Sequence, residues 1–379
     1  MNIEKTLEKI FSYDIVSVAV PISELERIAK IDDYNSQFKA VLDISRVITT
    51  EDKDVQDLSD RFFELNIAVH GVDNAFSEFQ IGAFLDCQNK SSRYKTRFLI
   101  VDLGTTFVYV PFRVQDSIGL RVAGKKPFFM TYGIVSTDCL KETENKVTEA
   151  LIKISLFSMI QRQATEGEKP YQFNFYATVS DFENMKRSHW RSAHGINKLN
   201  ERVQVLTFDR SELSDSNIED MRLLCKEWYI DRLKVKNPEK GKFEDYYLMD
   251  LKKQDNLRYI LFYMDNILVG YSIVIALDTY YYVKGFKPLS SMDDKYMEDR
   301  GIDEYWIHYL KSNLCNFMIY KIDEYVIGEL GADFVAIGGK IDGLKKGENN
   351  HQDLMGYKKR LFKHCTPLIK APLLLDKTS

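Results

Sequence analysis

Tyr280-Tyr281-Tyr282-Val283-Lys284-Gly285-Phe286 is the stretch that decides the fold of this 379-residue chain. Its aromatic and β-branched residues predict a strand. A polar loop leads from it into a helical pattern over residues 305–330, which ends at Gly331, and a buried-looking strand follows at residues 333–340. A strand, a crossover helix and a second strand place polar groups at the carboxyl edge of a sheet. Because open α/β sheets bind ligands at that edge, we expect the functional site there.

The rest of the chain predicts two lobes with a similar order of elements. Helical and alternating patterns in the second half predict a strand at 203–208, a helix at 214–233 and a hairpin of 259–264 with 267–275. In the first half, residues 38–135 have a strand-like texture, with strands predicted at 97–103, 106–112 and 126–132. A helix at 143–163 and a strand at 173–178 are predicted to follow. We therefore predict an α/β (α+β) fold of two lobes, residues 1–200 and 201–379. Each lobe is a mixed, mostly antiparallel sheet flanked by helices, and the second carries the functional site.

The bulk composition indicates a folded protein in a reducing setting. Hydrophobic residues make up 45% and charged residues 28% of the chain, and the formal net charge is -4. That charge argues against a surface that binds nucleic acid all over, but it leaves room for a local basic groove. The five cysteines are far apart and predict neither a metal site nor a disulfide framework. With no signal-peptide pattern at the start and no run of transmembrane length, we expect a cytoplasmic protein.

Two places in the second half resemble a known superfamily. One is the basic segment 186–198, which is followed by a strand and a tryptophan-bearing helix. The other is Gly338-Gly339-Lys340, followed by the basic, aromatic segment 356–362. Together with the hairpin around Asp265-Asn266, they make residues 170–365 similar to the GNAT (Gcn5-related N-acetyltransferase) fold. The chain most resembles the tandem group with the Fem-type peptidoglycan aminoacyltransferases and the catalytic domain of phosphatidylglycerol lysyltransferases.

The resemblance implies an acyltransferase that joins an activated acyl or aminoacyl group to an amine. Acetyl-CoA enzymes of this superfamily usually have a glycine-rich loop that holds the pyrophosphate at a helix N-terminus. The corresponding residues here, 287–304, contain only Gly301. The expected donor is therefore aminoacyl-tRNA or another acyl donor such as acyl-CoA, with no tightly bound cofactor. The expected acceptor is an amine of a small molecule, a lipid, a peptidoglycan precursor or a modified nucleobase, and tRNA or another nucleic acid is a candidate partner.

A cationic segment at residues 186–202 is the first group of candidate site residues. Arg187 and Arg191 are suited to phosphate groups of a tRNA, nucleotide or lipid, and Trp190 offers a face on which a base stacks. We expect these three residues to bind substrate. The alternative is that the segment is an exposed helix or linker, since most charge-rich helices are simply solvated.

A second group lies in the strand at residues 280–286. Lys284 stands beside Gly285, and glycine in a strand often marks the close approach of a ligand. We expect Lys284 to polarise an acyl carbonyl and Tyr282 to line the substrate cleft. The alternatives are a lysine that points outward next to a bulge and a tyrosine that packs in the core.

A third group follows the last predicted strand. By resemblance, Lys340, Lys358 and Arg360 bind the donor, and the last two share one face of an extended strand. The alternative is an edge strand that lysines protect from aggregation. His351 is the candidate proton acceptor from the attacking amine, unless residues 345–353 are only a polar loop.

Two other functions stay open at this point. One is a non-catalytic binding module that uses the cationic segment for a nucleic acid or another partner. The other is an acetyl-CoA-dependent N-acetyltransferase that acts on a small molecule.

Overall fold

The computed structural model describes residues 2–47, 52–75, 96–115, 126–170, 172–209, 211–233, 257–277, 280–340, 362 and 364–375. The chain divides into two compact units. Unit 1 comprises Met1–Asn174, Lys340–Gly343 and Thr366–Ser379, and unit 2 comprises Phe175–Gly339 and Leu344–Cys365. The chain thus returns to unit 1 at its C-terminal end. We predicted a boundary between two domains after residue 200. It remains a prediction, because a compact unit need not be a domain that folds alone.

Unit 1 is built on a mixed sheet with the strand order β1-β3-β4-β5-β7-β14. Its strands are β1 (Val20–Pro21), β2 (Arg46–Val47), β3 (Thr96–Asp102), β4 (Phe107–Gln115), β5 (Phe128–Thr131), β6 (Val135–Ser136), β7 (Phe157–Gln163) and most of β14 (His364–Pro372). β3 and β4 form an antiparallel pair, whereas β5 and β7 are parallel. Residues 141–153 form the helix α8 between these two parallel strands. A strand, a crossover helix and a parallel strand are therefore present in this unit.

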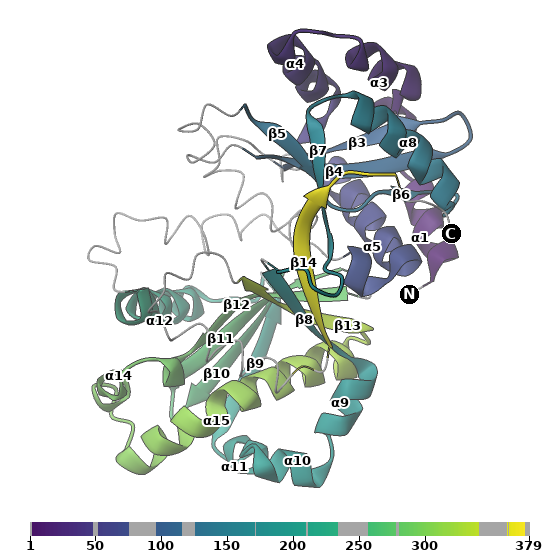
Figure 1. The fold of residues 1–379 in the computed structure, drawn as a ribbon. Coiled ribbons are helices and arrows are strands. Elements are labelled where there is room, and N and C mark those ends of the chain that lie inside the picture. The colour runs from purple at the N-terminus through teal and green to yellow at the C-terminus, as the bar shows by residue number, and fades with distance from the viewer. Residues whose placement is uncertain are drawn as a thin grey trace. The chain divides into compact units, whose positions relative to one another are not determined.

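Helices cover both faces of this sheet (Figure 1). They are α1 (Ile3–Phe11), α2 (Ile15–Val18), α3 (Ile22–Ala29), α4 (Tyr34–Ile44), α5 (Lys53–Ala75) and α8 (Lys141–Lys153). On one face, apolar residues of α3, α4 and α8 pack with the sheet in one core cluster. On the other face, Phe62 of α5 stacks on Tyr109 of β4, with ring centroids 5.0 Å apart. Tyr109 also hydrogen-bonds Ser59 of α5 through its hydroxyl, at 2.6 Å.

Two predictions for unit 1 were wrong. The helix expected at 143–163 ends at Lys153, and residues 157–163 form the strand β7. Phe157 and Ile160 of β7 continue the helical apolar spacing of α8, so the sequence of both elements resembles one helix. The strand-like texture expected from residue 38 is also wrong for its first part, since α4 and α5 occupy residues 34–44 and 53–75.

Unit 2 contains the sheet with the strand order β8-β13-β12-β11-β10-β9. Its strands are β9 (Val203–Asp209), β10 (Leu257–Met264), β11 (Ile267–Ala276), β12 (Tyr280–Pro288) and most of β8 (Gln172–Thr178) and β13 (Phe334–Lys340). Asp265 and Asn266 both have positive φ angles, 49° and 65°, as the tight turn between β10 and β11 requires. The predicted hairpin is thus confirmed.

The helices of unit 2 lie around this sheet (Figure 1). They are α9 (Val179–Met185), α10 (Ser188–Ala193), α11 (Ile196–Asn200), α12 (Asp215–Leu233), α14 (Asp294–Glu298) and α15 (Glu304–Asp323). A π-helical turn, Glu324–Glu329, extends α15. A Cβ on Gly270 of β11 would lie 2.6 Å from Sδ of Met318 in α15, so this glycine permits close packing of the helix on the sheet. The predicted fold class, two mixed sheets flanked by helices, is confirmed.

Candidate functional site

The strand β12 contains a β-bulge at Lys284. In its antiparallel pairing with β11, Gly285 lies opposite Ile273, whereas Val283 lies opposite Val274. Lys284 is therefore an extra residue on β12 that faces no partner in β11. A bulge bends its strand and takes backbone groups out of the regular ladder, and bulges are frequent next to active sites. This position was singled out in the sequence because of Gly285.

The other neighbour of β12 is the parallel strand β13. The two strands pair from Tyr280 opposite Phe334 to Tyr282 opposite Ala336. The bulge at Lys284 and the Gly338-Gly339 pair both follow this paired section toward the carboxyl ends. Since α15 connects the two strands, it starts near their carboxyl edge. The crossover unit thus has the topology in which open sheets bind ligands.

The first turn of α15 has an acidic character. Asp303 is its N-cap, and its carboxylate accepts a hydrogen bond from the backbone N–H of Trp306 at 3.0 Å. Glu304 follows in the first turn. Carboxylates at this position stabilise the helix N-terminus and compete with an anionic ligand for the same N–H groups. This helix start is therefore poorly suited to bind a pyrophosphate.

A buried lysine lies near the end of β12, and sequence reasoning missed it. Lys287 is 7% exposed and pairs with Tyr271 across the β11–β12 ladder. Its Nζ atom lies 3.8 Å from the ring centroid of Trp228 in α12. Burial lowers the pKa of Lys287 and raises the pKa of nearby Cys225, also in α12. The only signal in the sequence was a lysine that continues an otherwise apolar strand.

The cationic segment packs along α15 within unit 2. At the start of α15, Nζ of Lys198 lies 4.4 Å from the ring centroid of Tyr305. Trp190 of α10 is half-buried and stacks on His194, with centroids 4.1 Å apart, and on Tyr320, at 6.2 Å. Tyr320 is sixteen residues after Glu304, about 24 Å along the helix axis. Trp190 thus lies beside the C-terminal half of α15.

Arg187 and Arg191 have different surroundings on α10. Arg187 is the exposed N-cap of this helix. Arg191 lines a hollow of about 460 Å³ together with Phe182, Lys186, Tyr320 and Glu324. The Nε atom of Arg191 is buried without a hydrogen-bond partner among the described residues. Burial raises the pKa of the Tyr320 hydroxyl, and Glu324 adds to that shift, whereas Arg191 opposes it.

The predicted site residues fall into three groups. Tyr282, Lys284 and Lys340 are placed in the neighbouring strands β12 and β13, although their side chains are outside the described part. Arg187, Trp190 and Arg191 lie together on or next to α10. His351, Lys358 and Arg360 lie outside the described residues. The structure thus places Tyr282 and Lys284 in the same strand and assigns Lys340 to unit 1, and the roles of all nine stay predictions.

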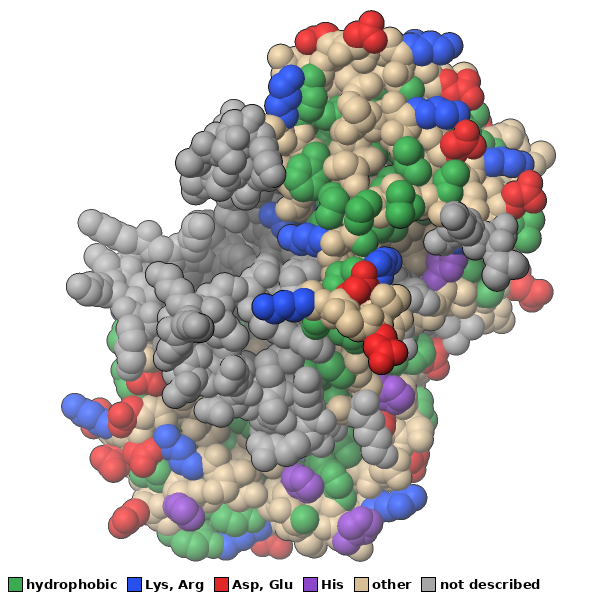
Figure 2. Space-filling model, in the orientation of Figure 1, with side chains coloured by type: hydrophobic (Ala, Val, Ile, Leu, Met, Phe, Trp, Pro, Cys, Tyr) green, Lys and Arg blue, Asp and Glu red, His purple; other side chains and the backbone are tan. Residues whose placement is uncertain are grey.

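Two properties of the described residues bear on the class of function. They contain no group of three or more His, Cys, Asp or Glu side chains arranged to hold a metal ion. In the same part of the chain, no helix has both the length and the apolar character needed to cross a membrane. On the face shown in Figure 2, acidic and basic side chains of the described residues are interspersed. On that face they form no single-sign field of the kind that attracts nucleic acid over a whole surface.

Comparisons with known proteins find solved structures that are similar to this chain, but no matching sequence family. No model of a protein family matches the sequence, and no curated protein matches it significantly. The solved structure of FemX is 11% identical and has a TM-score of 0.52; the match covers 83% of this chain and 96% of FemX. A conserved protein of unknown function from Bacteroides thetaiotaomicron is 12% identical with a TM-score of 0.49, and the match covers 82% of this chain and 97% of that protein.

A further similar structure is the C-terminal domain of a putative lysylphosphatidylglycerol synthetase from Agrobacterium fabrum. It is 7% identical with a TM-score of 0.44, and the match covers 83% of this chain and 92% of that domain. At these identities the likeness concerns the fold, and the FemX match is the one that supports it. The predicted resemblance to tandem GNAT-type structures is thus confirmed at the level of the fold.

Proposed function

We propose that this chain is an acyltransferase that joins an activated acyl or aminoacyl group to an amine, with transfer at the carboxyl edge of β12 and β13. The observation that supports this proposal most is the bulge at Lys284 in a strand whose parallel neighbour is reached through α15. The bulge frees backbone N–H groups in the strand that borders the crevice. Such fixed donors stabilise the negative charge that develops on a carbonyl oxygen during acyl transfer.

The reaction needs few other groups. The amine nitrogen attacks the carbonyl carbon, a tetrahedral intermediate forms, and the bond from carbon to the leaving oxygen or sulfur then breaks. His351 is proposed to accept the proton that the amine loses and to pass it to the leaving group. Lys284 adds positive charge near the carbonyl oxygen, and Tyr282 lines the crevice. Most of the rate acceleration then comes from holding the amine and the carbonyl close together in the orientation for attack.

The donor is proposed to be an aminoacyl ester, as in aminoacyl-tRNA, rather than acetyl-CoA. Asp303 caps the start of α15, and Glu304 adds a second carboxylate there, so this helix start is a poor pyrophosphate site. Lys340, Lys358 and Arg360 are the proposed contacts to the donor phosphates. Arg187, Trp190 and Arg191 are proposed to contact another part of a large substrate, because α10 packs beside the C-terminal half of α15.

A turnover assay tests this proposal. The full-length protein is incubated with a mixture of radiolabelled aminoacyl-tRNAs or with acetyl-CoA, each with and without a panel of amines that includes lysine, ethanolamine and glucosamine. We expect amine-dependent release of deacylated tRNA and a slower release of free CoA, or none. A protein that binds aminoacyl-tRNA tightly without consuming it is a binding module, and that result contradicts the proposal.

The first mutational prediction concerns Lys284. The substitution Lys284→Met removes the positive charge next to the reacting carbonyl. We therefore expect the amine-dependent rate of transfer to fall by about 10²-fold. Lys295→Met is the matched control, since Lys295 is exposed on α14. Both variants should unfold at the wild-type temperature. An unchanged rate in Lys284→Met would remove this residue from the site.

A further inference from the structure

A second hollow lies wholly within unit 1 and has no part in the proposed acyl transfer. It has a volume of about 580 Å³, which is in the range of small-molecule sites. It is bordered by the residues after β5, the first turns of α8 and the carboxyl end of β7, so it occupies the crevice of a parallel strand–helix–strand unit. Open α/β sheets bind ligands in such crevices.

The most unusual group in this hollow is the side chain of Asn66 on α5. Asn66 is 1% exposed, and neither Nδ2 nor Oδ1 has a hydrogen-bond partner among the described residues. A buried polar group without a partner is unfavourable, and such groups are rare in folded proteins. The unpaired donor and the unpaired acceptor of one amide therefore point to a ligand that pairs with both.

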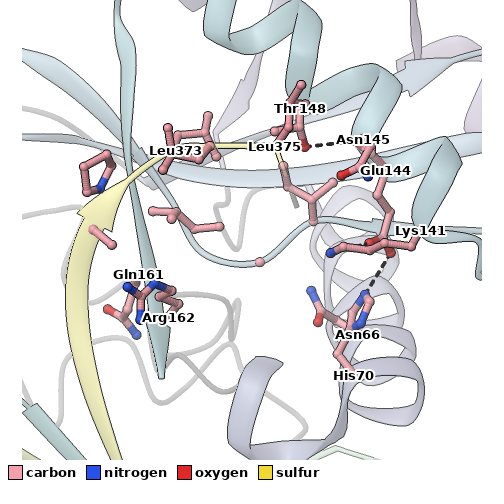
Figure 3. A pocket seen from close by; sticks show the side chains of 16 residues that line it. Asn66, His70, Lys141, Glu144, Asn145, Thr148, Gln161, Arg162, Leu373 and Leu375 are labelled. Carbon is pink, nitrogen blue, oxygen red and sulfur yellow. Dashed lines mark hydrogen bonds and ion pairs between the residues drawn. The ribbon is translucent and has the colours of Figure 1, made fainter. Parts of the chain in front are cut away.

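The amide of Asn66 lies close to Gly133, which has no side chain that would displace it. The φ angle of Gly133 is 79°, and a Cβ at this position would lie 2.9 Å from Nδ2 of Asn66. Any other residue would therefore be strained and would press against the amide. In Figure 3, Asn66 and His70 extend from α5 toward Lys141 and Glu144 of α8, and Gln161 and Arg162 lie on the opposite side of the hollow.

The charged side chains around the hollow compensate one another. The carboxylate of Glu144, which is 2% exposed, lies 2.8 Å from Nε2 of His70 and 3.0 Å from Nζ of Lys141. Arg162 makes two hydrogen bonds of 2.8 Å to Glu168. Among the described residues that line it, opposite charges are thus paired, so the hollow favours a neutral ligand. Its aliphatic lining includes Ile134, Ile160, Leu373 and Leu375.

We propose that this hollow binds a neutral ligand whose amide presents its N–H and C=O on the same side, next to an aliphatic group. Primary carboxamides and lactams have this cis arrangement. Either one forms two hydrogen bonds with the Asn66 amide in a closed ring, N–H to Oδ1 and Nδ2–H to C=O. A trans secondary amide offers only one of the two bonds, and a carboxylate offers no donor.

Ligand-observed NMR titrations of the full-length protein test this proposal with four probes. They are isovaleramide, δ-valerolactam, N-methylisovaleramide and isovalerate. We expect the first two to bind with millimolar dissociation constants, as fragments of about seven non-hydrogen atoms do. The last two should bind about 10-fold more weakly or not at all, because they leave Oδ1 or Nδ2 of Asn66 unpaired.

Two variants test whether the ligand binds at Asn66. In Asn66→Leu the affinity for isovaleramide should fall at least about 10-fold, while the unfolding temperature stays the same or rises because an unpaired buried amide is gone. Asn35→Leu is the control, since Asn35 is exposed on α4 of the same unit. Equal binding of N-methylisovaleramide by the wild type overturns the proposal even if a variant fails to fold. So does the absence of isovaleramide binding, which would leave a merely hydrated hollow.

Discussion

Glu64 of α5 shows how burial alone changes the chemistry of a single residue. Its side chain is 2% exposed, and burial raises its pKa to about 7, although Arg61 opposes the shift through an ion pair of 2.6 Å. An unfolded glutamate has a pKa of about 4.3. The folded protein therefore holds a proton on Glu64 at a pH where the unfolded chain has lost it.

This difference predicts a pH dependence of stability. Because the folded pKa is the higher one, the contribution of Glu64 is fully present below pH of about 4.3 and is lost as pH rises toward about 7. Each pH unit in this window costs about 1.4 kcal/mol. Between pH 5 and 7 the wild type should thus lose about 2–3 kcal/mol of unfolding free energy relative to Glu64→Gln.

Urea denaturation at several pH values measures this effect. Glu142→Gln is the control, because Glu142 on α8 is 83% exposed in its side chain. It should follow the wild-type pH profile. A Glu64→Gln profile that runs parallel to the wild type across this window would show that Glu64 is already ionised in the folded protein.

Residue-level features also show where sequence reasoning succeeds. Lys284 was found because a glycine in a strand has few explanations, and a bulge is one of them. Asn66 was missed because an asparagine in a helix normally belongs to the solvated face. Its burial depends on the sheet packed against α5 and on Gly133, which is far away in the sequence. Contacts of this kind are set by tertiary structure and leave no local signal.

At the scale of elements, α10 is exposed over most of its length and packs through Trp190. The ring of Trp190 stacks on both His194 and Tyr320, and Lys198 lies over the aromatic rings at the start of α15. These contacts use the aromatic face that the sequence suggested for a base. Apart from Trp190 and Arg191, the residues of α10 are exposed, so the alternative of a solvated helix stays open.

A substitution of Trp190 separates packing from substrate binding. Trp190→Ala removes both ring contacts, and we expect it to lower the unfolding free energy by about 2 kcal/mol. His189→Ala is the control, since His189 is the exposed neighbour on the same short helix. If the Trp190→Ala protein is as stable as the wild type but binds its donor less well, Trp190 acts mainly on the substrate.

Whole elements were predictable where their pattern was local. The hairpin β10–β11 was found from its turn residues, and α12 and α15 from long helical periodicity with capping residues. The strand β7 was read as helix because it follows α8 after three residues and its apolar residues Phe157 and Ile160 continue the helical spacing.

At the scale of the whole molecule, the two units have the same kind of crossover. In unit 1, α8 connects the parallel strands β5 and β7, and in unit 2, α15 connects β12 and β13. The sequence predicted this duplication from the order of elements, but it took residues 173–178 as the strand after the helix in the first lobe, where the structure has β7. It did not predict that the chain returns to unit 1 near its end, because strand pairing between distant segments has no local signature.

The returning strand gives a prediction for truncation. β14 pairs with β7 from Leu368 opposite Gln163 to Pro372 opposite Met159, and Leu373 is part of the core of unit 1. A chain that ends at Cys365 loses both, and β7 becomes an edge strand. We expect thermal unfolding well below the wild-type temperature, or an insoluble protein.

A chain that ends at Leu375 is the control for this truncation and should unfold like the wild type. The contrary result is a shortened chain, ending at Cys365, that unfolds as the wild type does. It would mean that β14 contributes little to unit 1.

The proposed function is tested most directly by a structure of the protein with a stable donor analogue. An aminoacyl-3′-amino-3′-deoxyadenosine carries the carbonyl of the donor on an amide that does not transfer. We predict that its carbonyl oxygen lies about 2.7–3.1 Å from a backbone nitrogen at the Lys284-Gly285 bulge. An analogue bound away from β12, or with its carbonyl turned from the bulge, would contradict the account.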